Sequence, residues 1–132
     1  MKKRPLNVKS GKGATLSSIK RGEIWLVNLD PTIGAEIRKT RPVIVLSSDA
    51  LGKLPVKLVA PLTGWKAYLA QNVWHVKIVP DKANGLSKPS SVDTLQLRGV
   101  DTQRFIHKIG DVSPQIMESI TAAIVILIEH EL

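Results

Sequence analysis

From residue 22 onward, short apolar runs alternate with clusters of turn residues. The runs are rich in β-branched and aromatic residues, which predicts β-strands rather than helices. The run at 42–46 is apolar without interruption, so we expect it to be buried on both faces of a sheet. The predicted strands cover residues 24–29, 42–46, 56–60, 73–78 and 91–98, with a brief further strand around 108–109.

Proline and glycine signals mark the limits of several strands. Pro61 is expected to end the third strand at an edge or a bulge, because proline has no N–H for the ladder. Asn84-Gly85, within the turn-rich loop 81–89, predicts a hairpin. Residues 101–105 are expected to form a short helical turn.

The run at 73–78 alternates between apolar and polar positions. A period of two predicts a strand with one face on the core and the other facing solvent. The apolar face holds Trp74, Val76 and Ile78, and the other face holds Val73, His75 and Lys77. His75 is therefore interpreted as a surface residue of a strand.

The C-terminal segment has the pattern of an amphipathic helix. Ser113 is a suitable N-cap, and Pro114 occupies the first helical position. Val125 and Ile126 broaden the apolar face, so we expect burial on more than one side, by the sheet together with a neighbouring element or a second chain. The stretch is far shorter than the roughly 20 residues of a membrane span. The apolar positions at helical spacing are Ile116, Ile120, Ala123, Ile124, Leu127 and Ile128.

Together these elements predict one mainly β (α+β) domain, a strongly bent antiparallel sheet or partial barrel capped by the terminal helix. The 132 residues suffice for a single hydrophobic core. We expect the folded body at 21–132. Residues 1–20 show no hydrophobic period and no secretory signal, which predicts a flexible basic arm that either attracts nucleic acid or only aids solubility.

The formal net charge of +8 belongs mainly to this arm. Residues 1–21 hold seven of the 19 basic side chains and no acidic one. The rest of the chain holds 12 basic and 11 acidic side chains. The net charge therefore does not identify the body as a nucleic-acid binder, although a local basic patch is compatible with it.

Composition also narrows the chemistry. The absence of cysteine excludes disulfides and thiolate metal sites and favours a reducing compartment. His75, His107 and His130 lie far apart, without metal-ligand spacing. Phosphate-cradling glycine loops, nucleophile elbows and zinc motifs are absent. We therefore expect neither a metal nor another cofactor.

The stretch 30–42, between the first two strands, is the strongest candidate for chemistry. Arg41 opens a buried strand, so its backbone should be fixed while its guanidinium offers a planar fork of donors suited to phosphate. Thr63 can add a hydroxyl to the same phosphate, and Glu36 can accept a proton. Two alternatives stay open: the stretch is a solvated hairpin loop, or Arg41 pairs with Glu36 or Asp30 to hold it in place.

The start of the body carries motifs at characteristic mutual spacing. They are RGEIW at 21–25, DPTIGAE at 30–36, TRPVIVLS at 40–47 and VAPLT at 59–63. Their combination resembles the PemK/MazF family of toxin endoribonucleases, the mRNA interferases of type II toxin–antitoxin systems. The similarity covers about residues 20–130 and none of the arm.

The resemblance implies a small SH3-like antiparallel β-barrel, PemK/CcdB-like, with a C-terminal helix, and a cytoplasmic homodimer. It implies metal-independent, sequence-selective cleavage of single-stranded RNA, often mRNA, and a cognate antitoxin that occupies the RNA groove. It assigns catalysis to Arg41 and Thr63, and Glu36 matches a loop glutamate of the family. The chain departs from the family pattern at Ile37, where many members have glutamine, and within 91–98, where some have an arginine and an acid.

RNA carries its own nucleophile, the 2′-hydroxyl. We therefore expect Arg41 and Thr63 to hold the scissile phosphate while cleavage yields 2′,3′-cyclic phosphate and 5′-hydroxyl ends. Specificity is expected from bases stacked on side chains and read at their edges, with 30–40 as a mobile flap. The candidate substrate-binding residues are Ile33, Gly34, Arg38, Lys39, Ser47, Trp65, Asp93 and Gln96, with Tyr68 as a further stacking platform.

Two functions from other classes stay open on the sequence. The same barrel fold also serves non-catalytic toxins that poison a protein target such as gyrase. A plain RNA-binding barrel, with affinity supplied by the basic arm, is the third interpretation, and it predicts a steep salt dependence of binding.

Overall fold

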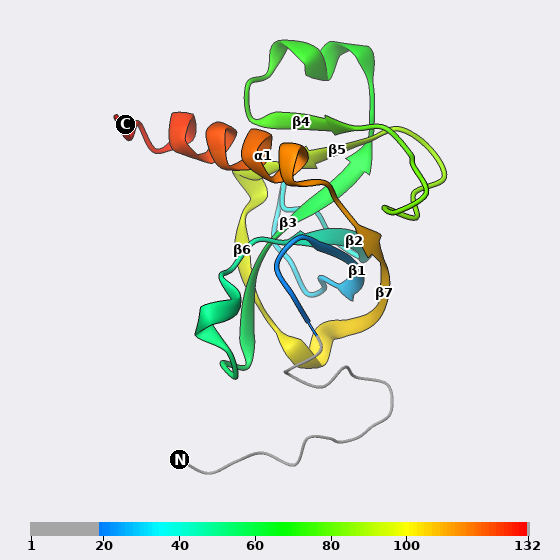
Figure 1. Ribbon diagram of the computed structural model, residues 1–132, viewed down its shortest axis with the longest axis vertical. Helices are drawn as coiled ribbons and strands as arrows, with labels where there is room; N and C mark the ends of the chain where they lie inside the picture. Colours follow the sequence, from blue (N-terminus) through cyan, green and yellow to red (C-terminus); the bar gives the residue numbers. More distant parts are fainter. Residues whose placement is uncertain (1–18, 132) are drawn as a thin grey trace.

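The computed structural model describes residues 19–131, which form a bent seven-stranded sheet and one α-helix (Figure 1). The predicted arm lies outside the described residues except for its last two. One of these two, Ile19, is already buried in the core with 2% of its surface exposed. The folded body therefore includes the end of the stretch that was predicted to be an arm.

The elements follow one another with short connections. The strands are β1 (Glu23–Asn28), β2 (Thr40–Val45), β3 (Val56–Gly64), β4 (His75–Ile78), β5 (Ser90–Asp93), β6 (Arg98–Asp101) and β7 (Phe105–Asp111). The short 3₁₀ helices are η2 (Asp49–Leu51), η3 (Ala67–Gln71), η4 (Thr94–Gln96) and η5 (Thr102–Arg104), and the α-helix is α1 (Pro114–Leu127).

β3 is the centre of an antiparallel sheet. The strand order is β4-β5-β3-β2-β1-β7, and β6 also pairs with β3. One edge of β3 faces β2, whereas the other faces β6 along its first half and β5 at its end. The end strands β4 and β7 do not pair with each other, so the barrel is not fully closed. The prediction of a mainly β, barrel-like fold with a C-terminal helix is confirmed.

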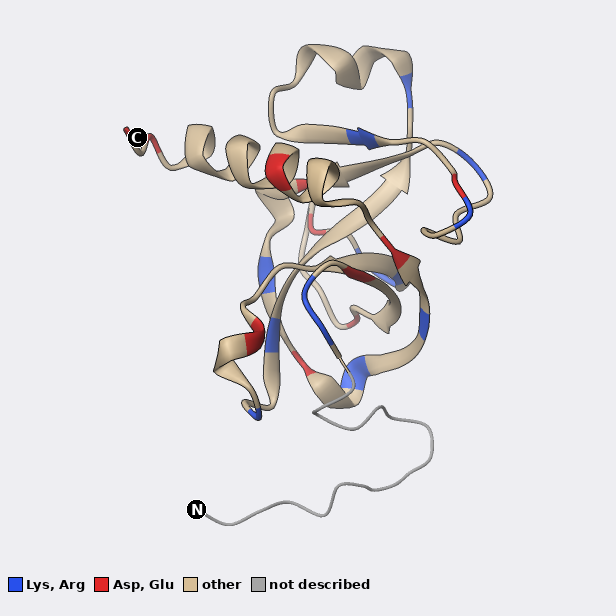
Figure 2. Ribbon diagram, viewed as in Figure 1, with Lys and Arg blue, Asp and Glu red and all other residues tan. Residues whose placement is uncertain are grey.

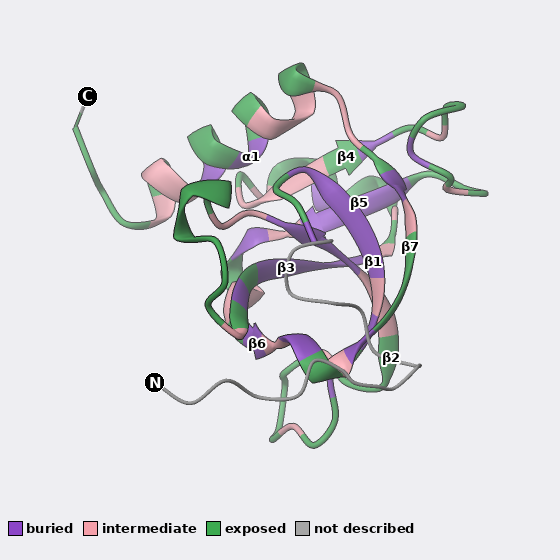
Figure 3. Ribbon diagram, turned by 60° about the horizontal axis from the view of Figure 1, so that its bottom comes forward, coloured by how far each residue is buried: buried purple, intermediate pink, exposed green. Residues whose placement is uncertain are grey.

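Two hydrophobic cores lie on opposite faces of this sheet. Buried residues are found along β1, β3 and β5 (Figure 3). The first core is enclosed by the barrel strands, where the rings of Trp25 and Phe105 meet edge to face at 5.8 Å. The second lies under α1, around the fully buried Ile120. Neighbouring residues such as Val43 and Ile44 point into different cores, which confirms that the run at 42–46 is buried on both faces.

β3 continues through Pro61, which was predicted to end it. The partners on one edge change at this point, because β6 pairing ends at Val59 and β5 pairing starts at Leu62. Pro61 lies between them, where no strand on that edge requires its backbone N–H. The strand therefore extends to Gly64 and carries Thr63 inside the sheet.

The single strand predicted at 91–98 is instead β5, η4 and β6. The carboxylate of Asp93 accepts a hydrogen bond from Leu95 N at 3.1 Å, and Thr94 Oγ1 donates to Trp74 O at 2.7 Å. These side-chain bonds compete with the sheet ladder and turn the chain. β5 and β6 then return to the same edge of β3.

Other boundaries shift by a few residues. β4 begins at His75 rather than at residue 73, and β7 extends well beyond the predicted 108–109 because it pairs along the length of β1. The hairpin signal at Asn84-Gly85 is confirmed, since the loop joins the antiparallel strands β4 and β5. The predicted helical turn at 101–105 is η5.

Helix α1 begins as predicted. Ser113 Oγ accepts a hydrogen bond from Ile116 N at 3.2 Å, and Pro114 follows at the first position. Only Ile120 and Ala123 are fully buried, so the helix packs on one side within the chain. Burial of the rest by a second chain stays a prediction. No helix among residues 19–131 has the length and apolar character needed to cross a membrane.

Candidate active site

Arg41 and Thr63 lie at one end of the sheet, on neighbouring strands. β2 and β3 pair Val43 with Pro61, and continuing this register by two residues places Arg41 opposite Thr63. Side chains directly opposite on an antiparallel pair have Cβ atoms about 5 Å apart and share one face. The sheet therefore brings together two residues that the sequence separates by a whole strand and loop.

The pairing extends this pair into a row. Thr63 lies opposite Ser91 of β5, and Ser91 lies opposite Lys77 of β4. The residues next to them, Leu62 and Val92, point into the core under α1. The row therefore lies on the face of these strands that is turned away from the helix. We call Arg41, Thr63, Ser91 and Lys77 the polar row.

The guanidinium of Arg41 is available for a ligand. Its Nε donates to Arg38 O at 3.2 Å, and its other N–H groups bond to no side chain or backbone group within 19–131. The predicted alternative, an ion pair with Glu36 or Asp30, is not formed. Glu36 accepts a hydrogen bond from Ile33 N at 2.7 Å, and Asp30 accepts one from Lys39 N at 3.0 Å.

The loop between β1 and β2 is anchored at its base and its middle. Gln96 accepts from Ile37 N at 3.2 Å and donates to Ala35 O at 3.4 Å, while the Ile37 side chain packs on the first core. This packing explains why an apolar residue occupies position 37. Arg98 and Arg104 donate to backbone carbonyls at the loop base, those of Leu29, Asn28 and Asp30.

The tip of the loop is open to solvent. Ile33 is 82% exposed, Gly34 is exposed, and Arg38 Nη2 reaches back to Gly34 O at 3.3 Å. The anchored middle and open tip leave a short exposed segment beside Arg41. That this segment moves over a ligand, as a flap would, stays a prediction.

Charge is dispersed over the body, as the composition indicated (Figure 2). Within the polar row, however, two cationic side chains flank two hydroxyl groups without an acid between them. Lys77 Nζ lies 5.1 Å from the centre of the Trp65 ring. Ser91 is fully buried, so Arg41, Thr63 and Lys77 are the members of the row that can offer hydrogen-bond donors and positive charge to a phosphate.

Comparisons with known proteins identify the family of the chain. Residues 20–128 match the family of PemK-like, MazF-like toxins of type II toxin–antitoxin systems. The chain belongs to this family. The resemblance inferred from the motifs at 21–63 is thus confirmed, and the match covers almost all of the described body.

Individual relatives of this PemK/MazF chain support the assignment. Endoribonuclease EndoA of Bacillus subtilis is 30% identical over 107 residues, covering 80% of this chain and 90% of EndoA. MazF of Deinococcus radiodurans shares the fold with a TM-score of 0.70 at 20% identity, covering 84% and 96% of the two chains. An endoribonuclease from a mycobacterial species, solved in complex with its cognate antitoxin, has a TM-score of 0.69 at 16% identity, covering 86% and 98%.

Not all residues predicted to bind the substrate lie in the polar row. Trp65 lies under Lys77, and Asp93 lies one pair beyond Ser91, opposite His75. The side chain of Gln96 is hydrogen-bonded to the loop between β1 and β2. Ser47 lies beyond the opposite end of β2 from Arg41, where its Oγ accepts from Leu58 N at 3.2 Å. The structure thus separates Ser47 from the other candidates.

Three residues in and beside the polar row were missed from the sequence as candidates. Ser91 and Lys77 complete the polar row, and His75 Nδ1 lies 2.7 Å from Ser91 Oγ. The alternation at 73–78 already placed His75 and Lys77 on one face, but it did not show that Thr63 lies nearby. Only the pairing of β4, β5 and β3 supplies that contact.

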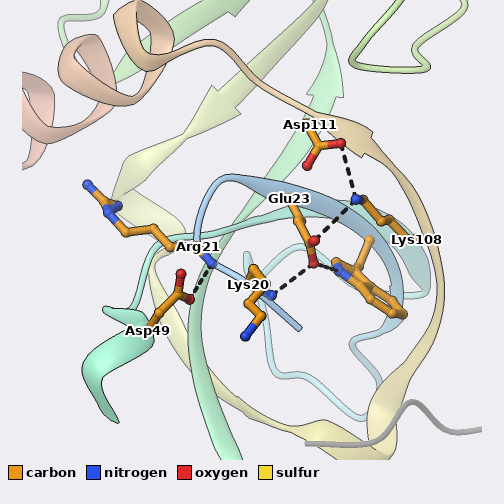
Figure 4. Close-up of polar contacts among 7 residues, drawn as sticks. Lys20, Arg21, Glu23, Asp49, Lys108 and Asp111 are labelled. Atoms are coloured by element: carbon orange, nitrogen blue, oxygen red, sulfur yellow. Dashed lines mark hydrogen bonds and ion pairs between the residues drawn. The ribbon is translucent and has the colours of Figure 1, made fainter. Parts of the chain in front are cut away.

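A second charged cluster lies on β1 and β7 (Figure 4). The nearly buried carboxylate of Glu23 accepts from Lys20 N at 2.8 Å and from Trp25 Nε1 at 2.9 Å, and it pairs with Lys108 Nζ at 3.1 Å. Lys108 also pairs with Asp111 at 3.1 Å. The hydrogen bond to Asp111, and then the one to Glu23, raise the pKa of Lys108 above its ordinary value.

An apolar groove of about 420 Å³ runs beside α1. It is lined by residues of the helix and by Arg21, and no candidate site residue contributes to it. The candidate site is therefore separate from this groove.

Proposed function

We propose that this protein is the toxin of a toxin–antitoxin system and a sequence-selective endoribonuclease that cleaves single-stranded RNA. The observation that carries the proposal is the polar row, in which Arg41 lies opposite Thr63 on a face that belongs to a PemK/MazF chain. The relative EndoA, named an endoribonuclease, is similar over most of both chains.

The RNA backbone would follow the polar row. Arg41 and Lys77 supply positive charge for phosphates, and Thr63 supplies a hydroxyl donor that bonds to no other group within the described part of the chain. Bases would contact the exposed side chains around the row and be read by stacking and edge hydrogen bonds. The candidates for this second role are Ile33, Gly34, Arg38, Lys39, Trp65, Asp93 and Gln96.

Cleavage needs no nucleophile from the protein. The 2′-hydroxyl of RNA attacks the adjacent phosphate, the bond from phosphorus to the 5′-oxygen breaks, and the products are a 2′,3′-cyclic phosphate and a 5′-hydroxyl. Arg41 and Thr63 would bind the non-bridging oxygens, where negative charge grows in the transition state. Neither a metal nor another cofactor takes part in this scheme, and Glu36, held by Ile33 N, would shape the loop.

The test is cleavage of a panel of single-stranded RNAs by the wild-type protein and by Arg41→Ala, Thr63→Ala and Lys88→Ala. Lys88 lies in the exposed β4–β5 loop and serves as a matched loss of one positive charge. We expect Arg41→Ala to reduce the rate about a hundred- to thousandfold, because a preorganised charged donor is lost. Near-normal cleavage by Arg41→Ala would contradict the assignment, and inhibition by a chelator would contradict the metal-free scheme.

The same experiment separates the rival functions. A toxin that poisons a protein target would cleave no RNA and would keep its toxicity in Arg41→Ala. A plain RNA-binding barrel would bind without cleaving, and deletion of residues 1–18, which leaves the buried Ile19 in place, would abolish the salt dependence of binding.

The partners follow from the family. We propose a cognate antitoxin that covers the polar row in the cytoplasm, in line with the mycobacterial endoribonuclease solved with its antitoxin. We also propose a homodimer, which would cover exposed apolar residues such as Ile126 and Ile128 at the end of α1. Size measurement in solution, alone and with the antitoxin, tests both.

A further inference from the structure

His75 joins the polar row through its side chain. Its Nδ1 lies 2.7 Å from the Oγ of Ser91, and Ser91, with none of its surface exposed, is the direct partner of Thr63 on β3. The His75 side chain therefore contacts the polar row at Ser91. Its Nε2 bonds to no other group within residues 19–131, and the residue is half-buried.

The proposed cleavage needs a group that accepts the proton of the 2′-hydroxyl. Arg41 is unsuited, because a guanidinium stays protonated in proteins. The Asp93 carboxylate caps η4 through Leu95 N, and the Glu36 carboxylate is bound to Ile33 N. Histidine exchanges a proton between pH 5 and 8 and is the most common general base in enzymes.

We propose that His75 is a catalytic residue, the general base that removes the proton from the attacking 2′-hydroxyl, and that Ser91 positions its ring. This inference rests on the proposed endoribonuclease function. In the tautomer required, Nδ1–H donates to Ser91 Oγ, and the lone pair of Nε2 faces the substrate. Ser91 is thus a positioning residue, because it acts only through the imidazole.

Nε2 takes the proton while the 2′-oxygen forms its bond to phosphorus and the bond from phosphorus to the 5′-oxygen breaks. The leaving 5′-oxygen takes a proton from water, and the imidazolium returns its proton to the solvent. No oxidant, metal or further reactant enters.

Charged groups from several elements face His75. Asp93 of β5 is its direct cross-strand partner, and Lys77 of β4 and Arg41 of β2 lie along the row. The ring of Trp74 lies 6.0 Å from the ring of His75. Helix α1 packs on the other face of β4, with Val76 and Ile78. The Asp93 carboxylate thus lies directly opposite the imidazolium that forms on His75 in the step.

The experiment compares kcat/KM over pH 5 to 8.5 for the full chain, His75→Gln, His107→Gln and Ser91→Ala on one single-stranded RNA that the wild type cleaves. His107 is an exposed histidine on β7, outside the row, and provides the matched control. For the wild type and His107→Gln we expect the rate to rise with pH to a plateau, since the base must be neutral. His75→Gln should lose this rise and about a hundred- to ten-thousandfold of the plateau rate.

Two further measurements distinguish catalysis from folding and binding. A substrate with 2′-deoxyribose at the cleaved position should bind His75→Gln as tightly as it binds the wild type, and the two proteins should unfold at similar temperatures. Ser91→Ala should keep the pH rise while lowering kcat more than it changes KM, because the ring is present but less well oriented.

The results distinguish a failure of the role of His75 from a failure of the proposed function. If the wild type and His107→Gln cleave RNA and His75→Gln does so with the same rate and pH profile, the role of His75 is overturned while the proposed function stands. A rate that falls with pH over this interval would overturn the assignment of His75 as base. A wild type that cleaves no RNA would overturn the proposed function itself.

Discussion

Two polar clusters on the same sheet differ in how completely their hydrogen bonds are used. On β1 and β7, the carboxylate of Glu23 binds two N–H groups and the ammonium of Lys108, which in turn binds Asp111. On the opposite end, Arg41 keeps guanidinium N–H groups that bond to nothing else within 19–131. The first cluster is satisfied internally and contributes to stability, whereas the second has donors left for a ligand.

The two regions also differ in rigidity. Next to the first cluster, the backbone of β7 is in close contact with the β4–β5 loop, where neither Gly85 nor Gly110 leaves room for a Cβ. The loop next to Arg41 is anchored by Gln96 and Ile37 yet ends in an exposed tip at Ile33. A rigid base with an open tip is the usual arrangement of a binding loop on a small barrel.

The largest effect should come from Arg41→Ala, measured in two ways. We expect the rate of RNA cleavage to fall about a hundred- to thousandfold, because charge stabilisation of the phosphate is lost. The free energy of unfolding should change by less than about 0.5 kcal/mol, because the side chain is only half-buried and makes one hydrogen bond. Urea unfolding alongside the cleavage assay checks both. A clear loss of stability would show that Arg41, like Glu23, stabilises the fold through its hydrogen bonds.

Gly85→Ala and Gly34→Ala test the difference in rigidity. Both glycines have positive φ, 68° and 59°, but a Cβ on Gly85 would meet Ile109 O at 2.3 Å, whereas one on Gly34 meets nothing within 4 Å. We expect Gly85→Ala to lose about 3 kcal/mol, from strain and overpacking together, and Gly34→Ala about 1 kcal/mol, from strain alone. Thermal and urea unfolding measure the two losses of stability. Equal losses would contradict the difference in rigidity between the two regions.

Glu23→Ala should reverse the result for Arg41. It removes the acceptor of the buried Trp25 Nε1–H and one partner of Lys108, so we expect a loss of about 2 kcal/mol in unfolding free energy. Cleavage per folded molecule should stay close to wild type, since Glu23 is far from the polar row. Glu118→Ala, on the outer side of α1, is the matched control for removal of one carboxylate. A large fall in cleavage at full folding would show that the two clusters are coupled.

The smallest effect is a loss of stability at alkaline pH. Asp111, and then Glu23, raise the pKa of Lys108 above its ordinary value of 10.5, so the folded chain holds this proton more tightly than the unfolded chain does. The stabilisation is therefore complete below the ordinary lysine pKa and disappears as the pH rises through the higher folded pKa. Unfolding measured from pH 9 to 12 should show this loss in the wild type and not in Lys108→Gln. The effect should be small because the Lys108 side chain is 41% exposed, and parallel profiles would contradict it.

The sequence by itself determined the elements whose signals are local. Apolar runs, the Ser113-Pro114 start of α1 and the turn at Asn84-Gly85 depend on neighbours a few residues away, so their patterns predicted them. The uninterrupted run at 42–46 also predicted burial on both faces, since only a strand between two cores tolerates it. The motifs at 21–63 led to the family, and with it to Arg41 and Thr63 as candidates.

Tertiary structure alone decided what depends on cross-strand register. It decided that β3 passes through Pro61, because the partners on that edge change at this residue, and that 91–98 divides at Asp93 and Thr94. It also brought His75 to Ser91 and Ser91 to Thr63, across three strands. Register couples residues that are far apart in the chain, and no local periodicity carries that information. Local sequence patterns therefore predicted most of the elements, whereas the pairing of the strands determines which residues form the site.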